Sequence, residues 1–146
     1  MLMALEVGAE LGPYRFEHIE QRDMTALAGI LRDPNPIHLD AAVVRSLGLG
    51  EHTVNQGPAN MGYLLNMLMD AAPGAHVSSL RLRFVGNLFE GETAVACGTV
   101  DRIERIDGVD QVECTVWLAA EPDRQALAGT ATLLLAAAPS EGETET

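Results

Sequence analysis

The sequence has few cysteines, few aromatic residues and little positive charge, and these shortages exclude several classes of protein. Its two cysteines, Cys97 and Cys114, fit neither the spacing of a zinc site nor a disulfide framework. Both fall in stretches that read as strands, so we expect two buried thiols in a reducing compartment. Nine basic residues stand against 21 acidic ones, and the net charge of -12 argues against a nucleic-acid partner.

Long hydrophobic runs are also missing. The best apolar stretch, GYLLNMLMDAA at residues 62–72, is too short to span a membrane and contains Asn66 and Asp70. The opening residues, MLMALEVGAEL, have no basic start and no long apolar core, so we expect no signal peptide. We therefore predict no membrane partner and a cytoplasmic location.

The remaining composition is that of a globular chain. Its 146 residues are enough for one domain with a real core, which Ala, Leu, Val and Met must supply because aromatics are only 4%. We predict a single domain over residues 1–138. The tail PSEGETET, residues 139–146, is acidic and has no core-forming residue, so we expect it to be disordered.

The first half of the chain reads as one short strand followed by helices. We predict a strand over residues 13–19, then a helix capped by Asp23 and ended by the prolines of DPNP. Asp40 is expected to cap a short helix through Arg45. The main helix is predicted over residues 57–71, because Pro58 suits a first helical turn. Its apolar face should be almost wholly enclosed; that face comprises Met61, Leu64, Leu65, Leu68 and Met69.

Everything after Pro73 reads as β structure. Leu80, Leu82 and Phe84 alternate with polar residues, and a second alternating run covers residues 111–118. Turn residues separate the runs at 107–108 and 121–123. We therefore predict an α+β fold, in which one antiparallel β-sheet wraps around the long central α-helix.

The stretch DPNPIHLD, residues 33–40, is the best candidate for chemistry. Asp33 and His38 are separated by a segment that Pro34 and Pro36 make stiff and that Asn35 can hold in a turn. Two titratable groups at a set separation are what general acid–base catalysis needs. DPNP alone is ordinary turn chemistry, so the rest of the segment decides between the two interpretations.

The longer segment DPNPIHLDAAVVRSLGL resembles the hydratase motif of the MaoC-like hotdog enoyl-thioester hydratases. The core of that motif is an Asp, any residue, Asn-Pro, an aliphatic residue and His. Later pieces are similar and in order: VNQGPANMGYLLNML, LRLRFVGNLFEGET and GTATLLL. The resemblance runs over roughly residues 12–136. It implies a hotdog fold that dimerises through its sheet edges.

The resemblance also implies roles for individual residues. Asp33 and His38 match the catalytic pair, Asn35 a supporting position, and Gly57 the backbone N–H that holds the thioester oxygen. The implied reaction adds water to a trans-2-enoyl-CoA to give the (R)-3-hydroxyacyl-CoA, or the reverse. We expect Asp33 to act as base and His38 as acid, with a sharing of the two roles as the alternative, and no metal and no cofactor beyond the coenzyme A of the substrate.

Some residues depart from the motif. Arg32 replaces a usual Gly, Gln56 a common His and Asn87 a common Pro, while Pro34 fills the variable position. The candidates for substrate binding are Gln56, Asn55, Tyr63, Arg81 and Arg83. For the two arginines, solvent exposure on a sheet face is slightly favoured over contact with phosphates.

Three other functions stay open at this point. One is a dehydratase acting on 3-hydroxyacyl groups of an acyl carrier protein. Another is a non-catalytic hotdog partner subunit or acyl-thioester binder, and a third is a hotdog thioesterase. The expected assembly is a homodimer or a heterodimer with a second hotdog chain. Short-chain, medium-chain and steroid-derived acyl groups, and both directions of the reaction, stay open as alternatives.

Overall fold

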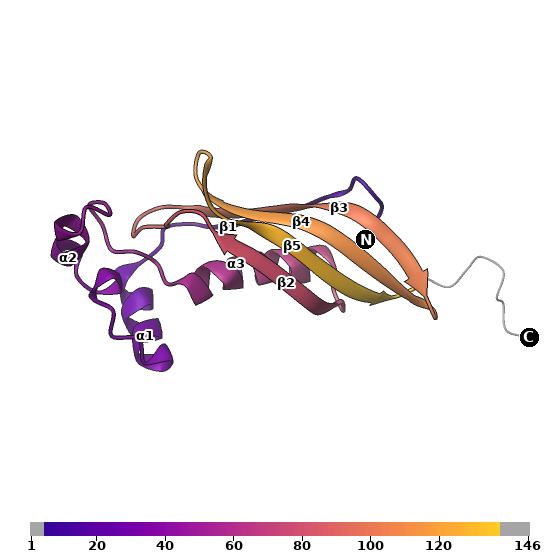
Figure 1. Cartoon of the computed structure of the whole chain (residues 1–146), viewed down its shortest axis with the longest axis horizontal. Helices are drawn as coiled ribbons and strands as arrows, with labels where there is room; N and C mark the ends of the chain where they lie inside the picture. The colour runs from indigo at the N-terminus through magenta and orange to yellow at the C-terminus, as the bar shows by residue number, and fades with distance from the viewer. Residues whose placement is uncertain (1–4, 138–146) are drawn as a thin grey trace, which may run out of the picture.

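The computed structural model describes residues 5–137, so the tail predicted at 139–146 lies outside the described residues (Figure 1). None of the helices formed by residues 5–137 is long and apolar enough to cross a membrane. The elements are, in order, β1 (Glu10–Phe16), α1 (Gln21–Leu31), η1 (Pro36–His38), α2 (Ala41–Ser46), α3 (Gly57–Ala71), β2 (His76–Phe84), β3 (Ala94–Ile106), β4 (Val109–Ala120) and β5 (Arg124–Ala136).

The strands form one five-stranded sheet in the order β1-β3-β4-β5-β2, with every neighbouring pair antiparallel. Helix α3 lies against one face of the sheet, and α1 and α2 gather beyond one end of it (Figure 1). Strand β2 runs toward that same end and forms one edge of the sheet. The predicted α+β arrangement, one antiparallel sheet around a central helix, is confirmed.

Local chemistry explains the hairpin between β3 and β4. Asp107 and Gly108 connect the strands with φ of +52° and +77°. Positive φ at both central residues is the requirement of a two-residue turn that matches the twist of the strands. The turn predicted at this position is therefore confirmed, and it sets the register of β3 and β4, which pair along nearly their whole length.

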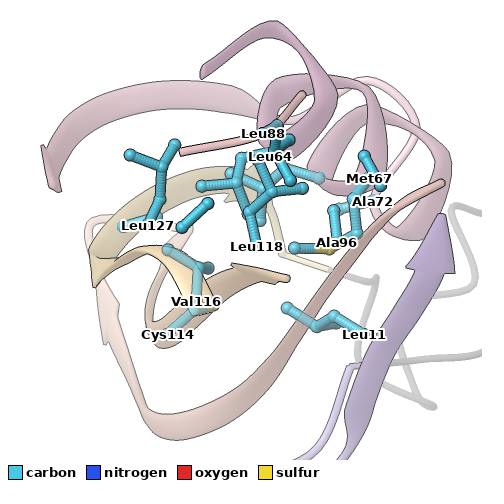
Figure 2. Packing of buried hydrophobic residues seen from close by; sticks show 14 of the residues in the cluster. Leu11, Leu64, Met67, Ala72, Leu88, Ala96, Cys114, Val116, Leu118 and Leu127 are labelled. Carbon is cyan, nitrogen blue, oxygen red and sulfur yellow. The ribbon is translucent and has the colours of Figure 1, made fainter. Parts of the chain in front are cut away.

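The core lies between α3 and the concave side of the sheet (Figure 2). From the helix, Leu64, Met67 and Leu68 are fully buried. Alternate residues of the strands meet them, as the period of two requires. The strand residues include Ala94, Ala96, Val100, Val112, Cys114, Val116, Leu118, Leu127 and Leu133. The many alanines leave room for the helix, so few aromatic rings are needed.

The predicted boundaries are right for α3 and α2 and wrong for two earlier elements. Strand β1 spans Glu10–Phe16, not residues 13–19. Helix α1 begins at Gln21 after Glu20, and Asp23 lies inside its first turn, because its N–H donates to Glu20 O. Glu20 caps with an extended backbone alone and no side-chain hydrogen bond, so no side-chain signal marks this end.

The end of α1 and one face of α3 also differ from expectation. Helix α1 ends at Leu31, before the prolines, because Arg32 takes a left-handed conformation at φ +52°. Arg32 thus takes the left-handed conformation that the usual glycine of the motif adopts with less strain. Helix α3 is less enclosed than predicted, since Met69 is 40% exposed.

Candidate active site

Hydrogen bonds within the DPNP loop hold Asp33 in place. The Asp33 N–H donates to Ala28 O at 3.0 Å and so fastens the loop to the end of α1. Asp33 Oδ1 accepts from the Asn35 N–H at 3.1 Å, and Asn35 Oδ1 accepts from the Ile37 N–H at 3.3 Å. These are the local side-chain turns that Asp and Asn favour. One oxygen of Asp33 is thus tied to the backbone, which leaves the other free.

The free oxygen of Asp33 faces the imidazole of His38. Asp33 Oδ2 lies 3.4 Å from His38 Nε2. The other ring nitrogen, His38 Nδ1, lies 2.6 Å from the carbonyl oxygen of Val54. A carbonyl oxygen only accepts, so Nδ1 carries a proton and donates it. In neutral His38, Nε2 therefore presents its lone pair on the side where Asp33 lies.

One residue that the sequence did not single out, Gln21, holds the backbone of His38, and Thr53 in turn bonds to Gln21. Gln21, the first residue of α1, donates from Nε2 to His38 O at 2.9 Å. Its Oε1 accepts from the hydroxyl of Thr53 at 2.5 Å. One glutamine side chain therefore joins α1, the His38 turn and the segment before α3. Neither contact is local, so no short motif could have revealed them.

Val54, whose carbonyl oxygen accepts the hydrogen bond from His38 Nδ1, belongs to a segment that is bonded to the loop after β2. The Asn55 N–H donates to Leu88 O at 2.7 Å, and the Glu90 N–H donates to Thr53 O at 3.0 Å. An isolated antiparallel bridge joins Val54 to Phe89. His38 is 7% exposed and Asp33 has 36% of its side chain exposed. The pair thus lies at a rigid and partly open site, with solvent access on the Asp33 side.

Gly57 begins α3 in the same segment. Gln56 precedes it with an extended backbone, and its side chain does not cap the helix, since Nε2 donates to Met24 O at 2.8 Å. Pro58 has no N–H. Within residues 5–137 the Gly57 N–H has no acceptor, so it remains a free donor at the positive end of a 15-residue helix.

The ring of Phe84 lies against Gly57. A Cβ at residue 57 would come 3.0 Å from Phe84 Cε1 and 3.3 Å from Cζ, so glycine is the residue that fits under this ring. Phe84 ends β2 and is nevertheless 59% exposed. The free N–H of Gly57 therefore has an apolar wall beside it, which the alternation of β2 residues did not predict.

The structure brings together two of the five predicted substrate-binding residues. Asn55 Nδ2 donates to Tyr63 Oη at 3.1 Å and to Asn60 Oδ1 at 2.9 Å. The Tyr63 ring stacks on Phe16 with centroids 4.7 Å apart, and burial raises the pKa of its hydroxyl. Gln56 instead points toward α1, is fully buried, and leaves its Oε1 without a hydrogen-bond partner.

Arg81 and Arg83 lie elsewhere. Both are exposed on β2 and pair in register with Thr130 and Ala128 of β5. They line a cleft of about 460 Å³ together with Trp117, on the face of the sheet opposite to α3. Within one chain they are therefore not part of the Asp33–His38 site, and solvent exposure was the favoured interpretation for them.

The other titratable residues in the described part of the chain add no second site. His18, His52 and His76 are exposed, and none of them pairs with an acidic residue. Among residues 5–137, no group of three or more His, Cys, Asp or Glu side chains could hold a metal ion. The described site therefore consists of one carboxyl group, one imidazole and one free backbone N–H.

No family model matches the sequence, and the search of curated proteins found no match. Solved structures do match. The (R)-hydratase from A. caviae involved in PHA biosynthesis has a TM-score of 0.76 at 21% identity, over 89% of this chain and 96% of that one. The MaoC-like dehydratase from Rhodospirillum rubrum has a TM-score of 0.79 at 20% identity, over 92% of this chain and 95% of that one.

A third structure is the C-terminally truncated HadBC (3R-hydroxyacyl-ACP dehydratase) complex from Mycobacterium tuberculosis. Its TM-score is 0.68 at 14% identity, over 92% of this chain and 100% of that one. The structural neighbours are thus MaoC-like (R)-hydratases and hydroxyacyl dehydratases with a hotdog fold. At these identities the likeness establishes the fold, and the hotdog fold implied by the sequence motifs is confirmed.

Proposed function

We propose that this chain is a hydratase that adds water to trans-2-enoyl-CoA thioesters, or removes it from the 3-hydroxyacyl product. The observation that carries the proposal is the arrangement of Asp33 Oδ2 and His38 Nε2, 3.4 Å apart, on a histidine whose Nδ1 bonds to Val54 O, three residues before the free N–H of Gly57. The shared fold with (R)-hydratase and 3R-hydroxyacyl dehydratase structures supports it. By the resemblance, the hydrated product has the (R) configuration.

The proposed step uses one proton shared by the pair. An ionised Asp33 accepts a proton from the water as the water oxygen bonds to C3. Protonated His38 donates its Nε2 proton to C2, and the C2=C3 π electrons pass through the thioester enolate to form that new C–H bond. Asp33 is then protonated and His38 neutral. Proton exchange between Asp33 and His38, which face each other, restores the starting state.

The fixed Nδ1 hydrogen bond to Val54 O explains why His38 suits the role of acid. The 2.6 Å bond keeps the ring oriented whether or not Nε2 is protonated. Because Nδ1 already carries a proton, the mobile proton of the imidazolium is the one on Nε2. The tight turn around Asn35 fixes the carboxyl group in the same way, so little reorganisation is needed during the reaction.

Gly57 supplies the third element. In the proposed complex its N–H donates to the thioester oxygen, where negative charge grows as water attacks C3. A free donor at a helix start is already oriented and carries partial positive charge. Removing one such donor from an enzyme typically costs about 10²–10³ in kcat. The chemistry needs no metal and no organic cofactor beyond the coenzyme A of the substrate.

The test is the loss of absorbance of the conjugated thioester. Crotonyl-, octenoyl- and a ring-bearing enoyl-CoA would be tried with the wild type, Asp33→Asn and His38→Ala. Matched controls are Asp40→Asn, which keeps an oxygen to accept the 2.9 Å bond from the Ala42 N–H, and His52→Ala on the exposed surface. Turnover that survives both site substitutions would refute the proposal.

A carrier-linked substrate is the second candidate. It is supported by the structural likeness to the HadBC (3R-hydroxyacyl-ACP dehydratase) complex. Turnover of the same acyl group on acyl carrier protein, with none on coenzyme A, would favour this candidate. Binding of acyl-CoA without turnover of either substrate would favour a non-catalytic partner subunit.

We also propose that the chain pairs with a second hotdog chain through β2. This strand is an edge of the sheet, and an unpaired edge strand is prone to association. HadBC is itself a complex. The native mass of the chain expressed alone distinguishes a homodimer from a chain that needs a different partner chain.

We also propose a cytoplasmic location, which fractionation of the producing cell would test.

A further inference from the structure

We propose that Phe84 is a specificity-determining residue that restricts substitution at C2 of the acyl group. The inference rests on the proposed function, because it assumes a thioester oxygen on the Gly57 N–H. It goes beyond that function by naming the residue that selects among acyl groups. Its basis is the position of one exposed aromatic ring on the residue that carries the free donor.

The sheet register places this ring. Phe84 pairs with Leu127, which is fully buried in the core. Opposite residues of paired strands share a face, so Phe84 projects from the side of the sheet on which α3 lies. Being the last residue of β2, it reaches the start of α3 rather than the middle of the core. The ring therefore meets Gly57 within contact distance while 59% of the residue stays exposed.

The position of the ring defines what can sit on the donor. An oxygen that accepts from the Gly57 N–H lies beside the α-carbon that Phe84 covers. The carbonyl carbon and its neighbour C2 then lie next to the ring edge, and an added methyl group at C2 competes with the ring for space. Protein interiors are packed so densely that one added methyl group disturbs the contacts around it.

The neighbouring residue offers a matched control. Val85 is 51% exposed and follows Phe84 directly, but its N–H is already bonded to Ala126 O at 2.9 Å, and the three atoms nearest to a Cβ at residue 57 all belong to Phe84. Val85→Ala thus removes exposed apolar surface beside the site without opening space at the donor. Phe84→Leu keeps an apolar side chain, and Phe84→Ala opens the space fully.

The experiment compares crotonyl-CoA with 2-methylcrotonyl-CoA. Wild type is expected to favour the unsubstituted substrate. Phe84→Ala should raise the ratio of kcat/KM for the methylated over the unmethylated substrate by about tenfold, the discrimination that one methyl group typically carries. Phe84→Leu should give a smaller rise, and Val85→Ala should leave the ratio unchanged. Circular dichroism and a native mass are measured for each variant.

An unchanged ratio in folded Phe84→Ala of unaltered mass would overturn the inference while leaving the hydratase proposal intact. A Phe84→Ala protein whose native mass falls would also overturn it, because the ring would then be a subunit contact. Wild type without turnover on any enoyl thioester would instead refute the proposed function, and the specificity role with it. A raised ratio in Phe84→Ala together with an unchanged ratio in Val85→Ala supports the inference.

Discussion

Asp33 Oδ2 and His38 Nε2 face each other at 3.4 Å, and both residues belong to one short segment between α1 and α2. The carboxyl group is oriented by the Asn35 N–H and the imidazole by Val54 O. Each side chain therefore has one atom fixed and one atom directed toward its partner. This relationship leads to predictions that can be measured independently of the identity of the acyl group.

Asp33→Asn should lower kcat/KM for crotonyl-CoA by about 10²–10⁴, because the amide cannot accept the proton of the attacking water. The rate is measured with crotonyl-CoA in buffers of constant ionic strength. A rate of Asp33→Asn near that of the wild type would contradict the proposed role of Asp33 as base.

Gln21→Ala should lower kcat more than it raises KM. Gln21 holds His38 O at 2.9 Å and Thr53 Oγ1 at 2.5 Å, so its removal frees the backbone that orients the imidazole. We expect a loss of roughly 10-fold to 100-fold in kcat, in line with misplacement of a catalytic group by about 1 Å. Gln21→Glu keeps the acceptor for Thr53 but loses the donor to His38 O.

Comparing the two Gln21 variants separates positioning from stability. If kcat follows the loss of the donor while the melting temperature of Gln21→Glu stays near that of the wild type, Gln21 is a positioning residue. If kcat follows only the melting temperature across both variants, its role is structural. Gln125, which is exposed on β5, offers a control at Gln125→Ala.

Gly57→Ala should impair activity through Phe84 rather than through the backbone. The added Cβ would meet the ring at 3.0 Å, so the ring or the start of α3 must shift. In the Phe84→Leu background the same change should cost less, which a double-mutant cycle of kcat/KM measures. Additive effects of the two substitutions would show that the contact is unimportant.

Gly62→Ala is the matched control within the same helix. Its added Cβ meets nothing within 4 Å, so no side chain has to move. Alanine in a helix interior is better than glycine by about 0.5–1 kcal/mol, so Gly62→Ala should raise the melting temperature and leave turnover unchanged. The contrast between residues 57 and 62 isolates the role of the Phe84 ring.

The thiols should differ in reactivity. Burial raises the pKa of Cys114 to about 11, and burial also raises the pKa of the half-buried Cys97. Because thiolate is the reactive form, a disulfide reagent at pH 8 should label Cys97 slowly and Cys114 only when the chain unfolds. A Cys97→Ala variant reports Cys114 alone. Fast labelling of that variant in buffer would contradict the burial of Cys114.

The same shift predicts a direction for stability. The folded protein holds the Cys114 proton more tightly than the unfolded chain, whose thiol has the ordinary pKa of 9.0. The unfolded state thus loses its proton first as pH rises, so this stabilisation is complete below pH 9 and is lost between about 9 and 11. The free energy of unfolding, measured with urea, should fall from pH 8 to pH 10 by more in the wild type than in Cys114→Ala, which lacks this thiol.

Local chemistry made several features predictable from the residues. The turn around Asn35, the start of α3 at Gly57-Pro58 and the hairpin at Asp107-Gly108 depend on backbone preferences over a few residues. The α+β fold follows from one long apolar helix and the later alternating strands. By contrast, the start of α1 was misplaced at Asp23, because Glu20 caps that helix with no side-chain bond.

The sequence alone thus determined which two titratable groups face each other in the candidate site, since Asp33 and His38 are close along the chain and the prolines stiffen the loop. Only the tertiary structure decided what surrounds them. Val54 O, Gln21 and the Phe84 ring come to the site from other elements, through the packing of α1 and the register of β2. Such contacts depend on how distant segments pack, and no spacing within the chain encodes them.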